Sequence, residues 1–470
     1  MKTCTMKFGG TSVGSPEAIA NVVRIVGGAV REGKRVVVVV SAMASVTDGL
    51  LESVRLAAAG DRWGYTSLSQ SIRDRHEQAI NLLLTAGPDR DRTLLDVNRL
   101  LDQYLELCHA IAVLGEVTPR ILDTVVSFGE RMSSLVVAAA LRDKGIQARA
   151  FDASELLITD DIHQNASPLW DETRARIHDR LLPELERGVT PVITGFIGST
   201  TGGVYTTLGR GGSDYSAAIF AAQVNSDEFI IWTDVDGVMT TDPRLDRRAQ
   251  VLPYISYQEI GELAYYGAKV VHPKTVQPIL DMDIPLWVRN TFNPDHPGTL
   301  IGRESRPCST IIKAITNVRR ISMLTVSGRG MLGVPGIAGR TFLASAQAGA
   351  NILMISQSSS EQSFCFTVTD DRAAAVKNAV ESELRQEIAQ HNVDGVDILP
   401  DVAIVTVVGA GMRGTPGVAG RVFTTLGDQR INVLAIAQGS SESSISFVLA
   451  EPDLERAIVQ LHNLALEAVE

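Results

Sequence analysis

The C-terminal third of the chain contains an internal repeat, which strongly limits the folds that this region can adopt. Residues 321–369 match residues 402–450 without a gap and at a constant offset. The first copy reads GRGMLGVPGIAGRTF from Gly328, and the second reads GAGMRGTPGVAGRVF from Gly409. Each copy predicts the order strand, Gly-rich turn, helix, strand, tight turn, strand and helix. We therefore expect two duplicated ferredoxin-like βαββαβ domains.

The second copy has no fourth strand of its own, because its last helix, near 452–466, runs almost to the end of the sequence. In the first copy, residues 393–399 supply this strand. A sheet with an open position would leave edge groups unpaired. We predict that the apolar segment 309–316 completes the second domain, so that the first domain is inserted within the second. The expected organisation is a linker and completing strand at 302–320, a first domain at 321–400 and a second at 401–470.

The residues before the repeat predict a separate domain. From about residue 2 to residue 301, short apolar runs alternate with helical patterns, which is typical of an α/β sandwich with a mostly parallel sheet. Residues from about 53 to 114 read instead as long amphipathic helices, a helical excursion that we attribute to packing. Residues 298–309, rich in Gly, Pro, Ser and charge, are the expected linker. The predicted strands are 35–41, 147–152, 190–195, 229–233 and 285–289.

Composition argues against several functional classes. The net charge of -11 is unfavourable for binding nucleic acid or an acidic membrane, since both require a basic surface. The four cysteines form no CxxC pair and the eight histidines form no HExxH motif, so we expect neither disulfides nor a metal site. The N-terminus lacks a signal-peptide pattern, and the longest apolar run, 36–40 with its flanks, is too short to span a membrane. These features predict a cytoplasmic protein.

Two Gly-rich turns before the repeat suggest binding of anions. KFGGTSVG begins at Lys7 after the first predicted strand, and TLGRGGSDYSAA begins at Thr207 before a predicted helix. Paired glycines let the backbone approach a ligand closely, and their N–H groups can cradle phosphate oxygens. Ser213 or Asp214 could cap the helix, whose N-terminus favours an anion. No GxxxxGK[ST] motif occurs, which argues against a P-loop protein. We expect two anionic ligands to meet between strand ends.

Two further segments offer nucleotide contacts. WTDVDGVMTTDPR, which begins at Trp232, offers Asp234 to a ribose or base and Arg244 to a phosphate. YYGAKVVHP adds a second lysine, Lys269.

A dinucleotide site in the repeat is an alternative that we set aside. Gly328, Gly330 and Gly333 satisfy G-x-G-x-x-G after a predicted strand. The acidic residue that should hold the ribose about 20 residues later is absent, because no Asp or Glu occurs before Glu361. We therefore assign these glycines to the turn itself or to a small effector.

Together these motifs resemble those of aspartate kinases of the amino-acid kinase superfamily, followed by two ACT domains. KFGGTSVG, SFGERMS from Ser127, TLGRGGSD and YYGAKVVHP carry the resemblance, which spans essentially the whole chain. The turns ISQSSSE and IAQGSSE are most similar to those in the kinase half of bifunctional aspartokinase–homoserine dehydrogenases. No dehydrogenase segment follows Glu470, so a monofunctional enzyme is expected. The resemblance implies a three-layer αβα kinase domain over residues 1–301, and a homodimer or homotetramer formed through the ACT domains.

The resemblance implies that ATP, with Mg²⁺, phosphorylates the side-chain carboxylate of L-aspartate on the route to lysine, threonine and methionine. Aspartate with a side-chain pKa of about 3.9 is already ionised, so no strong base is required. Catalysis would depend on positioning and on charge neutralisation by Lys7 and Mg²⁺, with Asp214 orienting the phosphates. Arg210 would hold the α-carboxylate and Glu130 the α-ammonium.

The resemblance assigns the remaining site residues as well. Many family members have tyrosine where this chain has Met239, which leaves the detailed nucleotide contacts open. The substrate residues implied are Ser41, Thr47, Gly211 and Ser213, and the ATP residues are Lys7, Gly9, Gly10, Thr233, Asp234, Met239, Arg244 and Lys269.

We expect threonine to be a feedback inhibitor bound by the ACT domains, with lysine as the alternative. Gln357 and Gln438 occupy matching positions and suit a neutral polar effector. A lysine site would require a carboxylate, and neither Gly-rich turn, 328–340 or 409–421, contains one. The expected effector residues are Gly333, Pro335, Ile337, Ala338, Asn351 and Gln357 in the first domain, and Gly414, Ala419, Asn432 and Gln438 in the second.

Two other functions remain as alternatives. The chain could be another amino-acid kinase, acting on glutamate, N-acetylglutamate or carbamate, although Glu130 suits a free ammonium and the sensor is duplicated. It could also be a non-catalytic amino-acid-binding regulator, although both Lys7 and Asp214 are retained.

Overall fold

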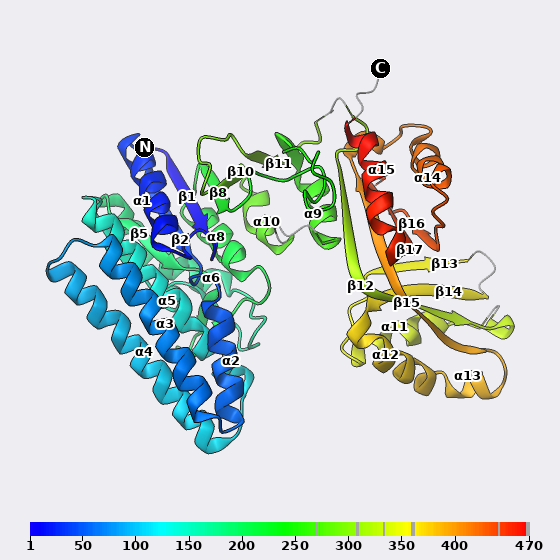
Figure 1. Cartoon of the computed structure of the whole chain (residues 1–470), viewed down its shortest axis with the longest axis horizontal. Coiled ribbons are helices and arrows are strands. Elements are labelled where there is room, and N and C mark those ends of the chain that lie inside the picture. Colours follow the sequence, from blue (N-terminus) through cyan, green and yellow to red (C-terminus); the bar gives the residue numbers. More distant parts are fainter. Residues whose placement is uncertain are drawn as a thin grey trace. The chain divides into compact units, whose positions relative to one another are not determined.

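The computed structural model describes residues 1–267, 271, 273–306, 310–331, 334–358, 362–439 and 442–466. The chain divides into two compact units, which Figure 1 shows with labelled helices and strands. Unit 1 comprises Met1–Val238, Pro253–Tyr257 and Val270–Arg303, and unit 2 comprises Met239–Leu252, Gln258–Lys269 and Glu304–Glu470.

Unit 1 is built on an eight-stranded sheet of order β3-β5-β2-β1-β8-β10-β11-β9. All neighbouring strands are parallel except β10 and β11. The five strands predicted from the sequence are all present within a residue or two of their expected bounds. The strands are β1 (Thr3–Phe8), β2 (Arg35–Val40), β3 (Ala148–Phe151), β5 (Thr190–Thr194), β8 (Glu228–Thr233), β9 (Tyr254–Ser256), β10 (Leu286–Asn290) and β11 (Thr299–Gly302). A smaller sheet contains β4 (Ile158–Thr159), β6 (Ile197–Thr200) and β7 (Tyr205–Thr207).

Helices cover both faces of the large sheet, which confirms the expected αβα sandwich. Alternate residues of a strand point to opposite faces, so Val36, Val38 and Val40 enter one apolar core and Val37 and Val39 face the other side. Full burial of both sets explains the unbroken valine run. The helices of unit 1 are α1 (Pro16–Arg31), α2 (Val46–Ala58), α3 (Arg62–Leu83), α4 (Pro88–Leu114), α5 (Pro119–Asp143), α6 (Trp170–Arg180), α7 (Leu182–Glu186), α8 (Gly212–Gln223) and α10 (Pro273–Leu280).

The helical excursion is confirmed as α2, α3 and α4, although α2 begins at Val46 rather than near residue 53. Figure 1 shows these long helices beside α5, and all four share one apolar core. Helix α5 is long and apolar enough to cross a membrane, but 83% of its most apolar window is buried inside the structure. Helix α5 is therefore a buried core helix of unit 1.

Unit 2 contains one six-stranded antiparallel sheet of order β13-β14-β12-β15-β17-β16. Its strands are β12 (Ala314–Ser327), β13 (Met354–Gln357), β14 (Ser363–Thr369), β15 (Gly395–Val408), β16 (Ala435–Ala437) and β17 (Ser444–Ala450). Its helices are α9 (Tyr257–Tyr265, whose first residue belongs to unit 1), α11 (Ile337–Gln347), α12 (Asp370–Glu383), α13 (Arg385–Ala389), α14 (Val418–Asp428) and α15 (Leu454–Leu466).

The two long strands confirm the predicted insertion. The first half of β12 pairs with the second half of β15, from Ala314↔Val408 to Val318↔Ile404. The second half of β12 pairs with β14 and with the first half of β15. Ile312 and Ile315 belong to the apolar core of the second domain. The completing strand therefore begins at Ala314, later than the expected residue 309, and the first domain is inserted within the second.

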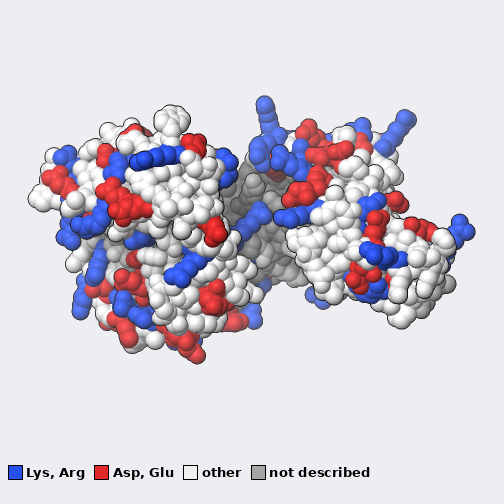
Figure 2. Space-filling model, turned by 90° about the horizontal axis from the view of Figure 1, so that it is seen from below, with Lys and Arg blue, Asp and Glu red and all other residues white. Residues whose placement is uncertain are grey.

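The division between the units differs from the expected boundary at residue 301. Segments Met239–Leu252 and Gln258–Lys269 belong to unit 2, because their hydrogen-bond partners lie there, as in the bond from Ile315 N to Thr240 O of 2.8 Å. The expected linker also begins with a strand, because Thr299–Gly302 forms β11. On the face that Figure 2 shows, acidic and basic side chains are interspersed, and the described residues form no continuous basic stripe there.

Candidate functional site

A cavity of about 810 Å³ lies in unit 1 where β1, β2 and β5 end and α8 begins. Ligands bind at this edge in open α/β sheets, beyond the carboxyl ends of the strands. Nine residues expected from the sequence line the cavity, and they come from segments far apart in the chain. They are Lys7, Gly10, Ser41, Thr47, Glu130, Arg210, Gly211, Ser213 and Asp214.

Lys7 and Asp214 form an ion pair inside this cavity, with 2.6 Å between Lys7 Nζ and Asp214 Oδ1. Lys7 is the fifth residue of β1 and is only 8% exposed. A close backbone contact favours glycine at position 10, since a Cβ there would lie 3.1 Å from Ala42 O, whereas a Cβ on Gly9 would make only an ordinary contact of 3.5 Å with Lys7 Nζ. The turn therefore follows the strand that carries Lys7 and passes close to the backbone of Ala42 at the edge of the cavity.

Helix α8 points its N-terminus at the cavity, and its cap differs from the expected one. The N-cap is Gly211, in a left-handed conformation with φ of 74°, and no side chain caps the helix. Ser213 and Asp214 lie in the first turn instead, which leaves their side chains available to a ligand or to Lys7. A helix start of this kind favours an anionic group.

Glu130 lies in the middle of α5, so it does not cap a helix start. It is 3% exposed and lines the cavity, and its Oε2 atom has no hydrogen-bond partner among the described residues. Burial raises the pKa of Glu130 to about 8, and the opposing effects of a backbone hydrogen bond at Ala42 and of the Lys7 charge are smaller. A buried carboxyl group with one unpartnered oxygen that lines a cavity is suited to bind a cationic group.

The helical excursion also supports the Gly-rich turn, which the sequence did not suggest. Arg75 of α3 donates a hydrogen bond of 2.7 Å from Nη2 to the carbonyl oxygen of Gly14, the last residue of KFGGTSVG. The excursion is therefore more than packing, because it fixes one end of this turn.

Asp123 and Gln164 also line the cavity, and sequence reasoning missed both. Asp123 is 1% exposed and accepts hydrogen bonds from Thr207 Oγ1 (2.6 Å) and Gln164 N (3.1 Å). Its Oδ2 also lies 2.7 Å from His163 Nδ1. Asp123 thus holds the loop that carries Gln164 against the cavity. Asp123 lies seven residues before Glu130 and therefore on the same face of the helix, and this spacing could have indicated from the sequence that both side chains face the cavity.

The residues expected to bind ATP are not all gathered at this cavity. Thr233 ends β8 and Asp234 follows it, both in unit 1. Met239 and Arg244 belong to unit 2 and do not line the cavity. Arg244 binds Asp242, with 2.6 Å between Nη2 and Oδ2. Lys269 lies outside the described residues.

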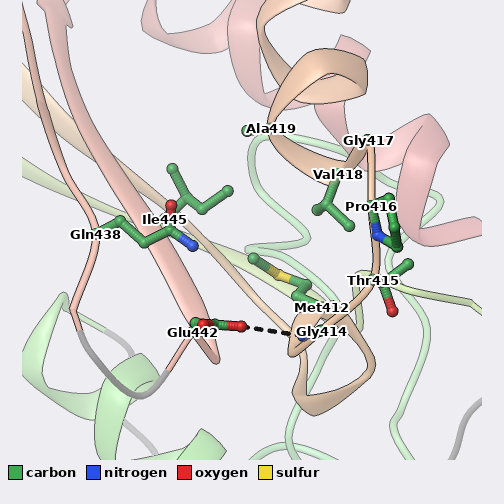
Figure 3. Close-up of a pocket in the computed structure, with 10 residues that line it drawn as sticks. All are labelled: Met412, Gly414, Thr415, Pro416, Gly417, Val418, Ala419, Gln438, Glu442 and Ile445. Atoms are coloured by element: carbon green, nitrogen blue, oxygen red, sulfur yellow. Dashed lines mark hydrogen bonds between the residues drawn. The ribbon is translucent and has the colours of Figure 1, made fainter.

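A second cavity, of about 280 Å³, lies in the second domain of unit 2, and Figure 3 shows it. Gly414, Ala419 and Gln438 line it, as expected for an effector site. Asn432, which precedes β16, does not line it. Glu442 does line it and accepts a hydrogen bond of 3.0 Å from Gly414 N. The Gly-rich turn itself contains no carboxylate, as noted from the sequence, but Glu442 supplies one to the pocket from the turn before β17.

The first domain differs from the second at the matching positions. Phe364 stands where the second domain has Ile445, and it is buried against Phe342 and Phe366. Pro335 lies in the turn before α11, Ile337 and Ala338 lie in its first turn, Asn351 precedes β13 and Gln357 ends it. Gly333 lies outside the described residues.

Comparisons with known proteins show the families to which the two regions of the chain belong. The model of the amino acid kinase family matches residues 2–290, and the ACT domain model matches residues 324–384 and 405–464. The chain is 37% identical over 463 residues to the chloroplastic bifunctional aspartokinase/homoserine dehydrogenase 1 of Arabidopsis thaliana, covering 97% of this chain and 50% of that protein. It is 32% identical to chloroplastic aspartokinase 1 of the same plant, covering 99% of this chain and 80% of that one.

Solved structures show the same likeness over the whole chain. Aspartokinase III of E. coli, in complex with aspartate and ADP in its R-state, matches with a TM-score of 0.83 and 30% identity, covering 99% of this chain and 100% of that one. The same enzyme in complex with lysine and aspartate in its T-state matches with a TM-score of 0.78, at the same identity and coverage. The chain therefore belongs to the amino acid kinase family, and within it to the aspartokinases that carry ACT domains.

Proposed function

We propose that this chain transfers the γ-phosphoryl group of ATP to the side-chain carboxylate of L-aspartate and releases 4-phospho-L-aspartate and ADP. One observation supports this most strongly: a single cavity brings together the Lys7–Asp214 ion pair and the buried Glu130, whose Oε2 atom has no hydrogen-bond partner among the described residues. Arg210 lines the same cavity, so the ammonium of Lys7, the carboxyl group of Glu130 and the guanidinium of Arg210 surround one small space. An amino acid with two carboxylates and one ammonium matches these charges.

The reaction follows from these charges. An oxygen of the aspartate side chain attacks the γ-phosphorus, and the bond to the bridging oxygen of ADP breaks. The attacking carboxylate is already ionised, so no base must remove a proton. Lys7 neutralises charge on the transferring group, while the N-terminus of α8 favours anionic oxygens nearby.

At this site the phosphates of the nucleotide, and not a cage of protein side chains, would hold most of the coordination of Mg²⁺. Among the described residues, no group of three His, Cys, Asp or Glu side chains could hold a metal. Mg²⁺ bound to a nucleotide keeps several waters and needs one or two carboxylates, and Asp214 is the one beside Lys7. When bound, it would reduce the negative charge of the phosphates.

The decisive test is an assay of ADP release with aspartate, glutamate and N-acetylglutamate in turn. We expect release with aspartate alone, and hydroxylamine should trap the acyl phosphate as a hydroxamate. Release with glutamate or N-acetylglutamate instead would identify another amino-acid kinase, and binding of aspartate without ADP release would identify a regulator.

Replacing Arg210 with alanine should raise the KM for aspartate about tenfold, the equivalent of roughly 1.4 kcal/mol for one charge-assisted contact at a solvent-accessible position. The KM for ATP should change little, because the α-carboxylate is the expected partner. Steady-state kinetics would measure both constants, with Arg180→Ala as a control at a surface ion pair outside the cavity. A rise confined to the KM for ATP would assign Arg210 to the nucleotide instead.

We further propose that threonine inhibits the enzyme by binding the second-domain pocket, with lysine as the alternative. Gln438 can both donate to and accept from an amino acid, and Thr415 adds a hydroxyl. Glu442 already accepts a hydrogen bond from Gly414 N, so fewer of its acceptor sites are available for the side-chain ammonium of lysine. Inhibition requires that the effector binds a low-activity state more tightly.

Gln438→Ala should raise the threonine concentration for half inhibition at least about tenfold, the equivalent of about 1.4 kcal/mol. Gln357→Ala in the first domain serves as the matched comparison. Inhibition curves with each amino acid would measure the effect. If lysine alone inhibits and Glu442→Gln abolishes this inhibition, lysine is the effector, and threonine inhibition unchanged in both glutamine variants would remove the pocket assignment.

A further inference from the structure

Asp123 is a buried acidic residue in the wall of the cavity in unit 1, and the proposed function gives it no role. It lies on α5, about two helical turns before Glu130, and is 1% exposed. Burying a carboxylate is unfavourable unless hydrogen bonds replace the water that it loses. The groups that bond to Asp123 therefore indicate what this residue holds in place.

Among the described residues, Asp123 has three donors, which come from two segments far apart in the chain. Thr207, the last residue of β7, donates from its hydroxyl to Asp123 Oδ1 at 2.6 Å. The backbone N of Gln164 donates to Oδ2 at 3.1 Å, and His163 Nδ1 lies 2.7 Å from the same oxygen. Since a carboxylate only accepts, His163 Nδ1 carries the hydrogen. Asp123 thus joins the end of β7 to the loop 160–168.

This loop and the turn after β7 also contact one another directly. Ala166 N donates to Thr207 O at 2.9 Å. Gly209, two residues after β7, passes so close to the loop that a Cβ on it would lie 2.9 Å from the carbonyl oxygen of Gln164. Gly209 also has φ of 75°, a left-handed conformation that favours glycine. A shift of the Gln164 backbone would therefore disturb the turn at Gly209.

Gln164 is itself held in an unfavourable backbone conformation. Its φ of 67° lies in the left-handed region, which residues with a side chain seldom adopt. Such a conformation persists only where the surrounding structure enforces it. The hydrogen bond from Gln164 N to Asp123 is one such constraint. Loss of the Asp123 acceptor should therefore let Gln164 relax, and the turn that it contacts should move with it.

We propose that Asp123 is a positioning residue that fixes the turn carrying Arg210, so that the ligand contact of Arg210 depends on it. Arg210 directly follows Gly209 and lines the cavity together with Asp123 and Gln164. Asp123 acts through this turn, because the hydrogen bonds that it accepts come from protein groups. The inference rests on the proposed function, which assigns Arg210 to the α-carboxylate of aspartate.

Asp123→Asn in the full-length protein is the first test. The carboxamide keeps the size of the side chain and can still accept from Thr207, but its amino group would face the N–H of Gln164, donor against donor. The variant should raise the KM and the Kd for aspartate about tenfold, the equivalent of about 1.4 kcal/mol. The KM for ATP should change less than about twofold. Steady-state kinetics measures both KM values, and calorimetry measures the Kd without turnover.

Paired variants of Thr207 give an independent test if Asp123→Asn does not fold. Thr207→Val keeps the shape of the side chain but removes the hydroxyl that donates to Asp123, and should raise the KM for aspartate about tenfold. Thr207→Ser keeps the hydroxyl and should hold this KM within about twofold of the wild-type value. Equal KM values in the valine and serine variants would contradict the inference.

Asp152→Asn is the matched control. Asp152 accepts a hydrogen bond of 2.9 Å from the hydroxyl of Tyr205, at the other end of β7, and does not line the cavity. This variant should leave both KM values within about twofold of wild type. A rise in the KM for aspartate as large as that in Asp123→Asn would show that the effect is a general loosening of β7, and would overturn the inference.

Arg210→Ala separates the inference from the proposed function. If Arg210→Ala raises the KM for aspartate but Asp123→Asn and Thr207→Val do not, the inference is wrong and the proposed function stands. If all three variants raise the KM for ATP instead, the assignment of Arg210 to aspartate is wrong, whereas the inference that Asp123 positions Arg210 stands.

Discussion

Replacing Lys7 with alanine should lower kcat at least about a hundredfold, as expected when one preorganised charge is removed from a transferring group. The Nζ atom lies in the cavity, 2.6 Å from Asp214 Oδ1, and the lysine is 8% exposed, so water cannot easily replace it. Its charge should act mainly on negative charge that develops during transfer, so the KM for aspartate should change much less than kcat.

Steady-state kinetics with saturating ATP would measure this effect. Lys34→Ala is the matched control, because Lys34 is also paired with a carboxylate, Glu228 Oε1 at 3.0 Å, but does not line the cavity. Thermal unfolding of both variants would show whether each is folded. An unchanged kcat in Lys7→Ala would contradict the assignment of Lys7. A decrease of kcat of equal size in Lys34→Ala would show that the effect is not specific to the cavity.

The sequence predicted the two ACT domains well, because their architecture follows from the order of strands and helices in each repeat and from the requirement that each strand inside a sheet is paired. A gapless repeat with one missing strand leaves few ways to complete the sheet. The pairing of Ala314 with Val408 is the solution that leaves no open position inside the sheet. The kinase strands were equally predictable, because a doubly buried strand such as 36–40 is apolar throughout.

The residues that the sequence missed are those whose role depends on contacts between distant segments. Glu442 reaches the pocket of the second domain from a turn 28 residues after Gly414, with which it forms a hydrogen bond. Asp123 acts on a loop about 40 residues away. Segment Met239–Leu252 reads as part of the kinase, yet its partner His462 follows Thr240 by 222 residues. No periodicity or motif within a single segment records such contacts.

Glu130 should make aspartate binding depend on pH. In the free protein, burial raises the pKa of Glu130 to about 8, so the carboxyl is mostly protonated at neutral pH. Binding the α-ammonium of aspartate favours the ionised form, so a proton is released on binding. The Kd for aspartate should therefore fall by up to about tenfold per pH unit from about pH 6 to 8, and level off above the pKa of the free protein.

Calorimetry in buffers with different ionisation enthalpies would measure both the Kd and the proton release. Glu130→Gln should bind aspartate at least about thirtyfold more weakly at pH 8, because loss of a buried charge pair costs about 2–5 kcal/mol. The variant should also lose the pH dependence. Glu77→Gln, which alters a carboxylate bonded to Asn98 outside the cavity, is the matched control.

Stability provides a separate check on the same carboxyl group. The pKa of Glu130 is raised above its ordinary value of 4.5, so the stability gained by its protonation is fully present below pH 4.5 and is lost as the pH rises through about 8. Above pH 8, Glu130→Gln should therefore unfold at a higher temperature than the unliganded wild type, since it buries no charge. A variant that is more stable yet binds aspartate poorly would show that Glu130 is retained for the ligand. Aspartate affinity that does not change between pH 6 and 8 would assign the ammonium to another group.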